Sequence, residues 1–167
     1  GYLVYRATGE MVLDHTGAGG TGMLGGRKRQ WSRLLAELAG LPLEKMPPIS
    51  SSIDIMGALG DDAARVMGLG SETQVIAGMA DIPAAAAGSG ALEDGEAHIN
   101  IGTSSWLCIS VSRPRNLGKY GIAPVVSADP EMYLMIGESE TAGACLGWFA
   151  KNLCRCADAR GPAGEGE

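Results

Sequence analysis

The pattern of elements expected from this 167-residue sequence changes near Gly95, and this change limits the possible folds more than any other feature. Before Gly95, short apolar runs alternate with helical patterns and with loops rich in glycine and proline. The Asp94-Gly95 pair is a strong turn signal. After it come three strand-like runs, at 97–102, 105–111 and 131–137. The sequence therefore predicts an α/β chain with a domain boundary near Gly95, residues 1–95 forming one domain and residues 96–167 another.

Local signals define the other elements. Six glycines between Gly17 and Gly26 predict a loop. Ser32 is placed to cap a helix that ends at Gly40 and Pro42. One face of that helix carries Leu34, Leu35 and Leu38. The remaining expected elements are the end of a helix at 1–10, a short strand at 10–16, an extended or looped segment at 46–59, a helix at 61–70, a buried strand at 73–78 and helices at 81–92 and 141–153.

Charge and composition exclude several classes of protein. Thirteen basic and nineteen acidic residues give a formal net charge of −6, and the longest basic run, at 26–30, is short, so nucleic acid is not an expected partner. No apolar run approaches the ~20 residues of a membrane-spanning helix, and no signal peptide opens the chain. We therefore expect a cytoplasmic protein with no membrane association and with reduced cysteines. Because the chain starts without methionine and ends in a Gly/Pro-rich polar stretch, we also expect a segment of a longer protein.

Three motifs give only weak functional signals. The Gly-Ala-Gly-Gly-Thr-Gly run at 17–22 has the spacing of a dinucleotide-binding loop, but no helix is expected directly after it, so we interpret it as a mobile or ligand-covering loop. Cys154 and Cys156 are candidate metal ligands, yet both histidines are remote in sequence and no metal site is expected. Ser104 and His98 are a weak hydrolase alternative, because Ser104 lacks the glycines of a nucleophile elbow.

Asp81 is the first candidate for chemistry. It follows the strand expected at 73–78 and precedes Pro83 and four alanines, so it lies at the start of a helix, where the dipole favours a negative charge. Aspartate is also a preferred N-cap residue, and a purely structural capping role is the alternative.

Two segments of small residues are candidates for phosphate binding. Gly102, Thr103 and Ser104 form a turn between two expected strands, and such a turn presents N–H and hydroxyl groups to a phosphate. The same residues also suit an ordinary β-hairpin. Gly143, where a strand gives way to a helix, lets a ligand approach the backbone or lets the helix pack closely.

Together these segments resemble the FGGY family of carbohydrate kinases, which have an actin-like ATPase (ribonuclease H-like) fold. Residues 78–107 are similar to the family's run from its Gly-Gly-Asp-Asn/Gln-Ala-Ala motif to its Gly-Thr-Ser strand pair. Residues 2–42 resemble its Tyr-Arg-Leu-Thr-Gly segment and the tryptophan and helix that follow, and residues 141–153 resemble a helix of its second domain. The resemblance covers residues 1 to about 153, is strongest to the xylulokinase-like branch, and implies the end of the first domain and the start of the second.

The resemblance implies a role for each matching residue. Asp81 matches the catalytic aspartate, which takes the proton from the sugar hydroxyl as that hydroxyl attacks the γ-phosphate of ATP. Gly102 and Thr103, with Ser104, match the turn that meets the nucleotide phosphates, and Gly143 matches a glycine near the nucleotide. Mg²⁺ is implied by the nucleotide chemistry alone, since no dedicated ligand set is present beyond Asp81.

The chain departs from the family pattern at the substrate. Ile82 and Pro83 stand where the family has Asn or Gln and then Ala, and Ile82 cannot donate a hydrogen bond to a sugar hydroxyl. The family's N-terminal phosphate hairpin, its early sugar contacts and its adenine pocket lie outside the 167 residues, so we expect the isolated chain to be inactive.

The expected function is ATP- and Mg²⁺-dependent phosphorylation of a ketopentose such as xylulose. The alternatives are another ketose or polyol, such as ribulose or a glycerol-like substrate, and a non-catalytic sugar or nucleotide binder on the same fold. The expected partner is a small-molecule sugar, and the oligomeric state is left open, with a homodimer as one expectation.

Overall fold

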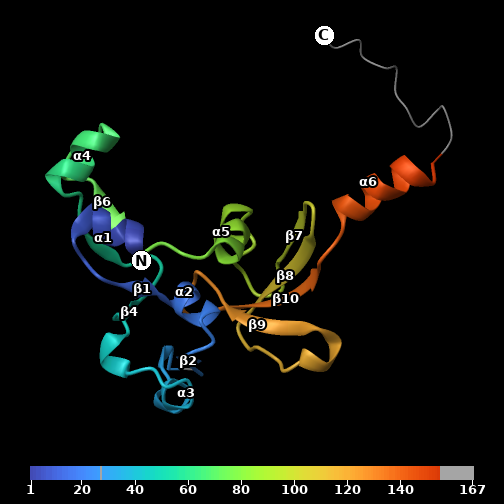
Figure 1. Ribbon diagram of the computed structural model, residues 1–167, viewed down its shortest axis with the longest axis horizontal. Coiled ribbons are helices and arrows are strands. Elements are labelled where there is room, and N and C mark those ends of the chain that lie inside the picture. The colour runs from blue at the N-terminus through green and yellow to red at the C-terminus, as the bar shows by residue number, and fades with distance from the viewer. Residues whose placement is uncertain (27, 155–167) are drawn as a thin grey trace, which may run out of the picture.

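The computed structural model describes residues 1–26 and 28–154 of the chain. Figure 1 shows small helices and two-stranded sheets in the first half, and a four-stranded sheet with α5 and α6 in the second. Up to residue 80 the elements are α1 (Tyr2–Thr8), β1 (Leu13–Asp14), α2 (His15–Gly20), β2 (Leu24–Gly25), β3 (Gln30–Trp31), α3 (Arg33–Leu38), η1 (Leu43–Lys45), β4 (Ile49–Ser50), β5 (Ile55–Ala58), α4 (Asp61–Met67) and β6 (Gln74–Ile76). After it come α5 (Asp81–Gly88), β7 (Ala97–Ile101), β8 (Ser105–Val111), η2 (Gly118–Tyr120), β9 (Ile122–Val126), β10 (Tyr133–Ser139) and α6 (Gly143–Asn152).

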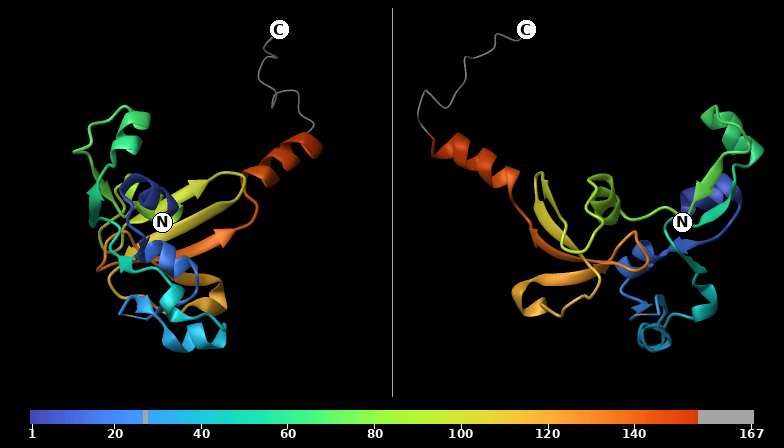
Figure 2. Two further views of the ribbon diagram at one scale, coloured as in Figure 1. Left: turned by 60° about the vertical axis from the view of Figure 1, so that its left-hand side comes forward. Right: turned by 180° about the vertical axis from the view of Figure 1, so that it is seen from behind.

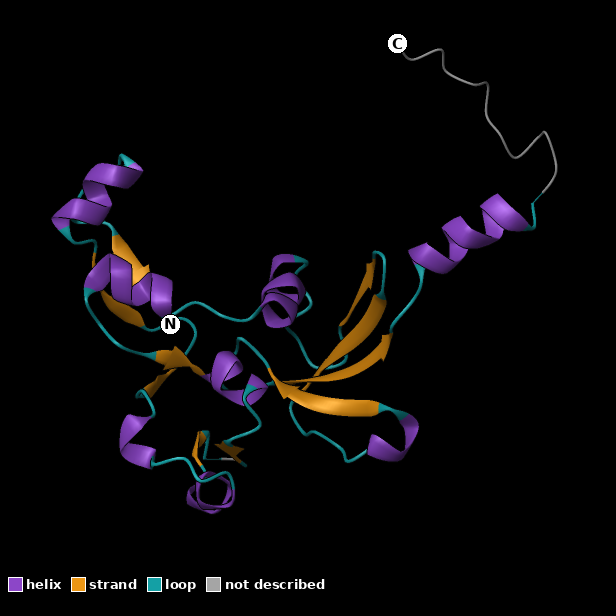
Figure 3. Cartoon of the chain, in the orientation of Figure 1, coloured by secondary structure: helices purple, strands orange, loops and turns teal. Residues whose placement is uncertain are grey.

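The four-stranded sheet has the order β7-β8-β10-β9, and all its neighbours are antiparallel (Figure 3). Its strands confirm the three predicted after Gly95, while β9 was not predicted from the sequence. The reason is Pro124, which interrupts the strand pattern because it has no N–H for a ladder. Since β9 lies at the edge of the sheet, one side of the strand needs no partner and the proline is tolerated.

Helix α5 packs on this sheet and builds the main hydrophobic cluster. Ala86 of α5 is 2% exposed and joins Cys108, Leu134 and Ile136 of the sheet. Leu134 on β10 is completely buried. The domain boundary expected near Gly95 would therefore fall between α5 and the sheet on which it packs, and it stays a prediction.

Helix α2 replaces the glycine-rich loop predicted from residue 17, so that prediction was wrong for its first four residues. The Asp14 side chain caps the helix by accepting hydrogen bonds from the N–H groups of Thr16 and Gly17. The glycines allow close packing: a Cβ at Gly17 would lie 2.9 Å from Asp14 Oδ1, and one at Gly19 would lie 3.2 Å from Val126 of β9. Tight packing and a strong cap therefore outweigh the low helix propensity of glycine.

The helix predicted after Ser32 is confirmed, and so is the strand predicted at 73–78, although that strand is not buried as expected. Ser32 caps α3 by accepting a hydrogen bond from the N–H of Leu35 at 3.3 Å, as predicted, but Leu34 and Leu38 on that helix are 65% and 77% exposed. Strand β6 exists, yet among the described residues it pairs only with β5, and Ile76 is 45% exposed. In the described part of the chain both apolar surfaces are uncovered.

Figure 2 shows α6 and the group formed by α1 and α4 at opposite ends of the molecule, with α5 and the sheet between them. The longest described helix, α6, has 10 residues. Among the described residues, accordingly, we find no helix with the length and apolar character that crossing a membrane requires.

Candidate functional site

Asp81 is the first residue of α5, and Ala80, not Asp81, is the N-cap. The Asp81 side chain is exposed, and its Oδ1 accepts a hydrogen bond from the N–H of Ile82 at 2.8 Å. The simple capping role weighed for Asp81 is therefore not the one it has here. Its carboxylate sits at the positive end of an eight-residue helix with one oxygen accepting from the backbone.

A cavity of about 500 Å³ has Asp81 and Ile82 in its wall. Residues of helix α2 and of the edge strand β9 also line it. The cavity therefore lies where the first half of the chain meets the sheet. The other lining residues are Thr16, Gly19, Gly20, Leu24, Gly26, Ala80, Pro83, Pro114, Pro124, Val125, Val126 and Tyr133. Asp81 is the one carboxylate among these residues, and most of its neighbours are apolar.

The residues predicted to meet phosphate lie together at the far end of the sheet. Gly102, Thr103 and Ser104 form the turn between β7 and β8, and the Gly102 N–H donates to the Ser104 carbonyl at 2.8 Å. The start of α6 packs on this turn: the Gly143 N–H donates to the Gly102 carbonyl at 2.9 Å, and the Ala142 N–H donates to the Thr103 carbonyl at 2.8 Å. Hydrogen bonds thus hold the hairpin turn and the helix start, which are about forty residues apart in sequence, against each other.

Gly143 is required by this contact. A Cβ at that position would lie 2.5 Å from the Gly102 carbonyl oxygen, closer than any real Cβ contact. Gly102 has more room, since its Cβ would find no atom nearer than 3.6 Å. The close-packing alternative weighed for Gly143 therefore describes this contact, and its proximity to a nucleotide stays a prediction.

The cavity that contains Asp81 and the β7–β8 turn are separate. The lining of the cavity does not include Gly102, Thr103, Ser104 or Gly143. A ligand that used both would have to reach from the α5 start to the β7–β8 turn.

Ser104 and His98 are not brought together. His98 pairs with Cys108 across the β7–β8 ladder, and four residues of strand, roughly 13 Å, separate Cys108 from Ser104. The His98 ring lies 5.0 Å from the Trp106 ring, and its Nε2 atom is buried. This arrangement gives no support to a serine hydrolase.

For a metal ion, the described residues hold no cluster of three or more His, Cys, Asp or Glu side chains. Of the pair considered above, Cys154 is described and Cys156 lies outside the described residues.

A network of buried polar groups stands behind Asp81. The Thr16 hydroxyl accepts a hydrogen bond from the N–H of Ala80 at 2.7 Å and itself donates to Asp14 Oδ2. Asp14, Thr16 and Ser52 are each 5% exposed or less. Sequence reasoning missed this network, although an aspartate two residues before a threonine at a helix start is a recognisable capping signal.

The pKa values of two side chains near this network, His15 and Asp54, are lowered. Burial lowers the pKa of His15, and the positive charge of Arg29 lowers it further. Hydrogen bonds from the Ser50 hydroxyl and the Ser51 N–H lower the pKa of Asp54. Neutral His15 and ionised Asp54 are the forms favoured beside α2.

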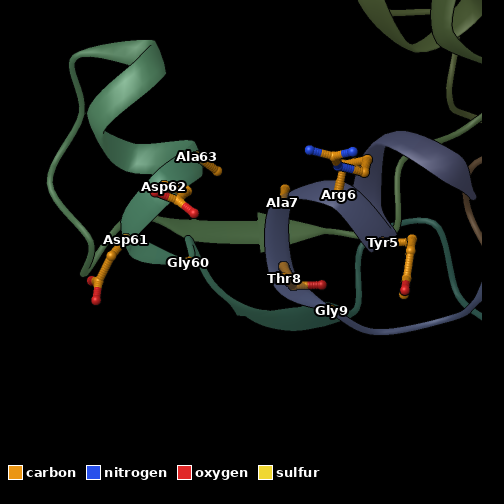
Figure 4. A pocket seen from close by; sticks show the side chains of 9 residues that line it. All are labelled: Tyr5, Arg6, Ala7, Thr8, Gly9, Gly60, Asp61, Asp62 and Ala63. Carbon is orange, nitrogen blue, oxygen red and sulfur yellow. The ribbon is translucent and has the colours of Figure 1, made fainter.

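A second cavity, of about 740 Å³, lies between α1 and α4. Figure 4 shows Arg6 on the α1 side of it and Asp61 and Asp62 on the α4 side. None of the predicted site residues lines this cavity.

Comparison with known proteins decides the family. The family model described as "FGGY family of carbohydrate kinases, N-terminal domain" matches residues 1–88, which is more than half of the chain. The chain belongs to the FGGY family. The match ends at the last residue of α5.

Relatives agree with this assignment. The chain is 30% identical over 154 residues to xylulose kinase of Escherichia coli K12, an alignment that covers 90% of this chain and 31% of the relative. It is 25% identical over 153 residues to autoinducer-2 kinase of the same strain, covering 92% of this chain and 29% of that protein. The FGGY chain thus spans about a third of the length of these relatives.

The crystal structure of ligand-bound xylulose kinase from Lactobacillus acidophilus superimposes with a TM-score of 0.83 at 26% identity, covering 91% of this chain and 31% of that one. The expected fold is confirmed: the chain is a partial α/β actin-like ATPase fold of the FGGY type.

Proposed function

We propose that this chain is a segment of a longer ATP-dependent carbohydrate kinase, and that it supplies the base that activates the sugar hydroxyl. The observation that supports the proposal most is Asp81: an exposed carboxylate at the start of α5, in the wall of a cavity, within the region that matches the family model. Exposed apolar side chains on α3 and α6 support the longer polypeptide, since Leu38 is 77% and Trp148 is 61% exposed.

The chemistry needs few groups from the protein. A sugar hydroxyl oxygen attacks the γ-phosphorus of ATP, the bond from that phosphorus to the β,γ-bridging oxygen breaks, and ADP leaves. The hydroxyl proton goes to the Asp81 carboxylate. Such a base contributes about 10²- to 10⁴-fold to the rate, and positioning and charge stabilisation supply most of the rest.

The nucleotide phosphates would be held by Gly102, Thr103 and Ser104, with the backbone at Gly143 beside them. Thr103 is exposed, so its hydroxyl is open to a ligand, whereas the N–H and the carbonyl of Gly102 already make hydrogen bonds to Ser104 and Gly143. The hydrogen bonds from α6 to the carbonyls of Gly102 and Thr103 fix the shape of the turn before any ligand binds.

For Mg²⁺, the site offers one protein ligand among the described residues. Asp81 offers one exposed carboxylate, and Mg²⁺ in kinases is held by one or two carboxylates, by water and by the substrate phosphates. With Asp81 as its one protein carboxylate here, a bound ion would supply positive charge that offsets the negative charge of the phosphates.

The substrate class we propose is a ketopentose such as xylulose. The 30% identity to an E. coli xylulose kinase supports this choice. Ile82 lies beside Asp81 in the cavity wall and offers no hydrogen bond from its side chain, so the substrate would present a carbon-bound hydrogen there. The similarity to an autoinducer-2 kinase keeps other ketoses and polyols such as ribulose or glycerol as alternative substrates.

A non-catalytic sugar or nucleotide binder on the same fold is the alternative function, favoured by Ile82 in place of an amide. We further propose that the kinase works in the cytoplasm, and a homodimer is its proposed assembly. The isolated 167 residues are expected to be inactive, because they span about a third of the relatives' length.

The test is ADP release by the full-length polypeptide that carries these residues, measured with ATP and Mg²⁺ over a panel of ketopentoses, other ketoses, gluconate and polyols. Turnover that depends on one sugar supports the kinase and names its substrate. ADP binding without turnover on any member would favour the non-catalytic alternative.

A further inference from the structure

The segment that leads into Asp81 is fixed by hydrogen bonds to a distant part of the chain. Three successive anchors are present: the Ala77 N–H donates to the Asp54 carbonyl at 3.0 Å, the Gly78 N–H donates to the Ser52 carbonyl at 3.0 Å, and the Ala80 N–H donates to the Thr16 hydroxyl at 2.7 Å. The last anchor holds the residue directly before Asp81, and it is the only one of the three made to a side chain.

Asp14 determines how the Thr16 hydroxyl is oriented. A threonine hydroxyl has one hydrogen to donate and two lone pairs to accept with. The hydrogen goes to Asp14 Oδ2, and a lone pair is therefore turned toward the N–H of Ala80. Asp14 Oδ2 also accepts from the Thr16 N–H at 2.8 Å, the Gly17 N–H at 3.2 Å and the Ser52 hydroxyl at 3.3 Å.

The carboxylate of Asp81 has little of its own to hold it. It is exposed, and the one hydrogen bond found for it among the described residues is to the neighbouring Ile82 N–H. Its position in the cavity thus depends on where the backbone of Ala80 and the first turn of α5 lie.

We propose that Thr16, oriented by Asp14, is a positioning residue for Asp81: its hydroxyl fixes the backbone of Ala80 and so sets where the catalytic carboxylate stands. The proposal rests on the proposed function of Asp81 as the base. Thr16 also lines the cavity, but its hydroxyl hydrogen is already donated to Asp14, so it is not free to donate to a ligand.

The positioning role predicts a specific kinetic pattern. Thr16→Val keeps the shape of the side chain but removes the hydroxyl, so the N–H of Ala80 loses its acceptor and the α5 start can shift. Because small misplacements of a catalytic group cost up to about 10²-fold, kcat per folded molecule should fall at least about tenfold. KM for the sugar and for ATP should stay within about twofold, and Thr16→Ser should restore most of the kcat.

The experiment compares wild type, Thr16→Val and Thr16→Ser in the full-length polypeptide, with the sugar found active in the panel above. Titration with ADP gives the number of nucleotide sites, so kcat is expressed per folded molecule and simple unfolding does not lower it. Thr21→Val is the matched control: its hydroxyl donates to the Ala18 carbonyl at the other end of the same helix, away from Ala80, and kcat should not change.

Each outcome of this comparison supports or overturns the positioning role of Thr16. A tenfold or larger loss of kcat with unchanged KM, restored by serine, supports the positioning role. A kcat within twofold of wild type overturns it, and so does a loss that appears only as a raised sugar KM, which would indicate direct substrate contact. If Thr16→Val binds no ADP, Thr16→Ala is measured in its place, and loss of ADP binding there too means that the hydroxyl serves folding and overturns the proposal. No turnover by wild type would instead refute the proposed function.

Discussion

At the residue scale, buried polar groups lie behind the candidate residues for catalysis and phosphate binding, and those candidates are exposed. Asp14, Thr16 and Ser52 are buried and hydrogen-bonded through Asp14, and Thr16 also accepts from the N–H of Ala80, whereas Asp81, Gly102 and Thr103 are exposed. Buried polar groups of this kind are costly unless every donor finds an acceptor, so they persist where they fix a geometry.

Gly143 provides a prediction at this scale. Gly143→Ala places a Cβ 2.5 Å from the Gly102 carbonyl oxygen, so the α6 start or the β7–β8 turn must move. We expect a loss of about 1–3 kcal/mol in the free energy of unfolding, together with weaker ADP binding by the full-length polypeptide. Urea unfolding and ADP titration measure the two effects.

Gly147→Ala is the control, because it lies in the same helix and its Cβ would meet no atom within 4 Å. It should be neutral or stabilise by up to about 1 kcal/mol, the usual gain for Gly to Ala in a helix. Equal destabilisation by both variants would mean that the contact with Gly102 is not what requires glycine.

At the element scale, α5 connects the candidate base to the sheet. Its first residue is Asp81 and its sixth, Ala86, is buried against Cys108 and Leu134. The packing of this one short helix therefore sets where Asp81 lies relative to the sheet whose β7–β8 turn carries Gly102 and Thr103.

Cys108 reports on this packing. It is 1% exposed, and burial raises the pKa of its thiol, so less of the reactive thiolate is present at neutral pH. A thiol reagent should therefore label Cys108 far more slowly than the exposed Cys145. Leu134→Ala opens a cavity beside Cys108, a change that costs about 2–5 kcal/mol in well-packed cores, and should speed its labelling at least tenfold. Mass spectrometry of the labelled peptides measures both rates. A Cys108 that reacts as fast as Cys145 in the wild type would contradict the core described here.

The elements predicted from the sequence were those with local causes. Ser32 and the Asp94-Gly95 turn act within a few residues, and the structure confirms both. Helix α2 was missed although its Asp14 cap is local, because its glycines are favourable only through close packing such as that of Gly19 on Val126, and strand β9 was missed because Pro124 is acceptable only where β9 ends the sheet. Local and distant causes also differ at the candidate site. The place of Asp81 at the start of α5 follows from neighbouring residues, whereas the hydrogen bond from the Ala80 N–H to the Thr16 hydroxyl spans 64 residues and has no local signal.

At the scale of the whole molecule, Arg29 ties the first half of the chain to the sheet. It is 7% exposed, its Nη2 donates to the Met132 carbonyl at 2.8 Å, and its guanidinium lies 4.9 Å from the centre of the Tyr133 ring. These contacts join the loop before β3 to the start of β10, next to the cavity that contains Asp81.

Arg29→Ala should therefore destabilise the fold. Hydrogen bonds to charged groups contribute about 1.5–3 kcal/mol, and we expect a loss of that order in the full-length polypeptide. Arg33→Ala, whose side chain is 82% exposed and 4.0 Å from Glu37, should change stability by less than about 0.5 kcal/mol. Thermal unfolding compares the two, and equal midpoints would show that Arg29 does not join the two halves.

The most direct test of the central claim is the turnover of Asp81→Asn in the full-length polypeptide, with its ADP affinity measured in parallel. The asparagine keeps the size and the hydrogen bond to Ile82 but cannot take a proton from a sugar hydroxyl. We predict a fall in kcat of at least about 100-fold with ADP affinity within twofold of wild type. A variant that keeps more than about a tenth of the wild-type turnover would show that Asp81 is not the base.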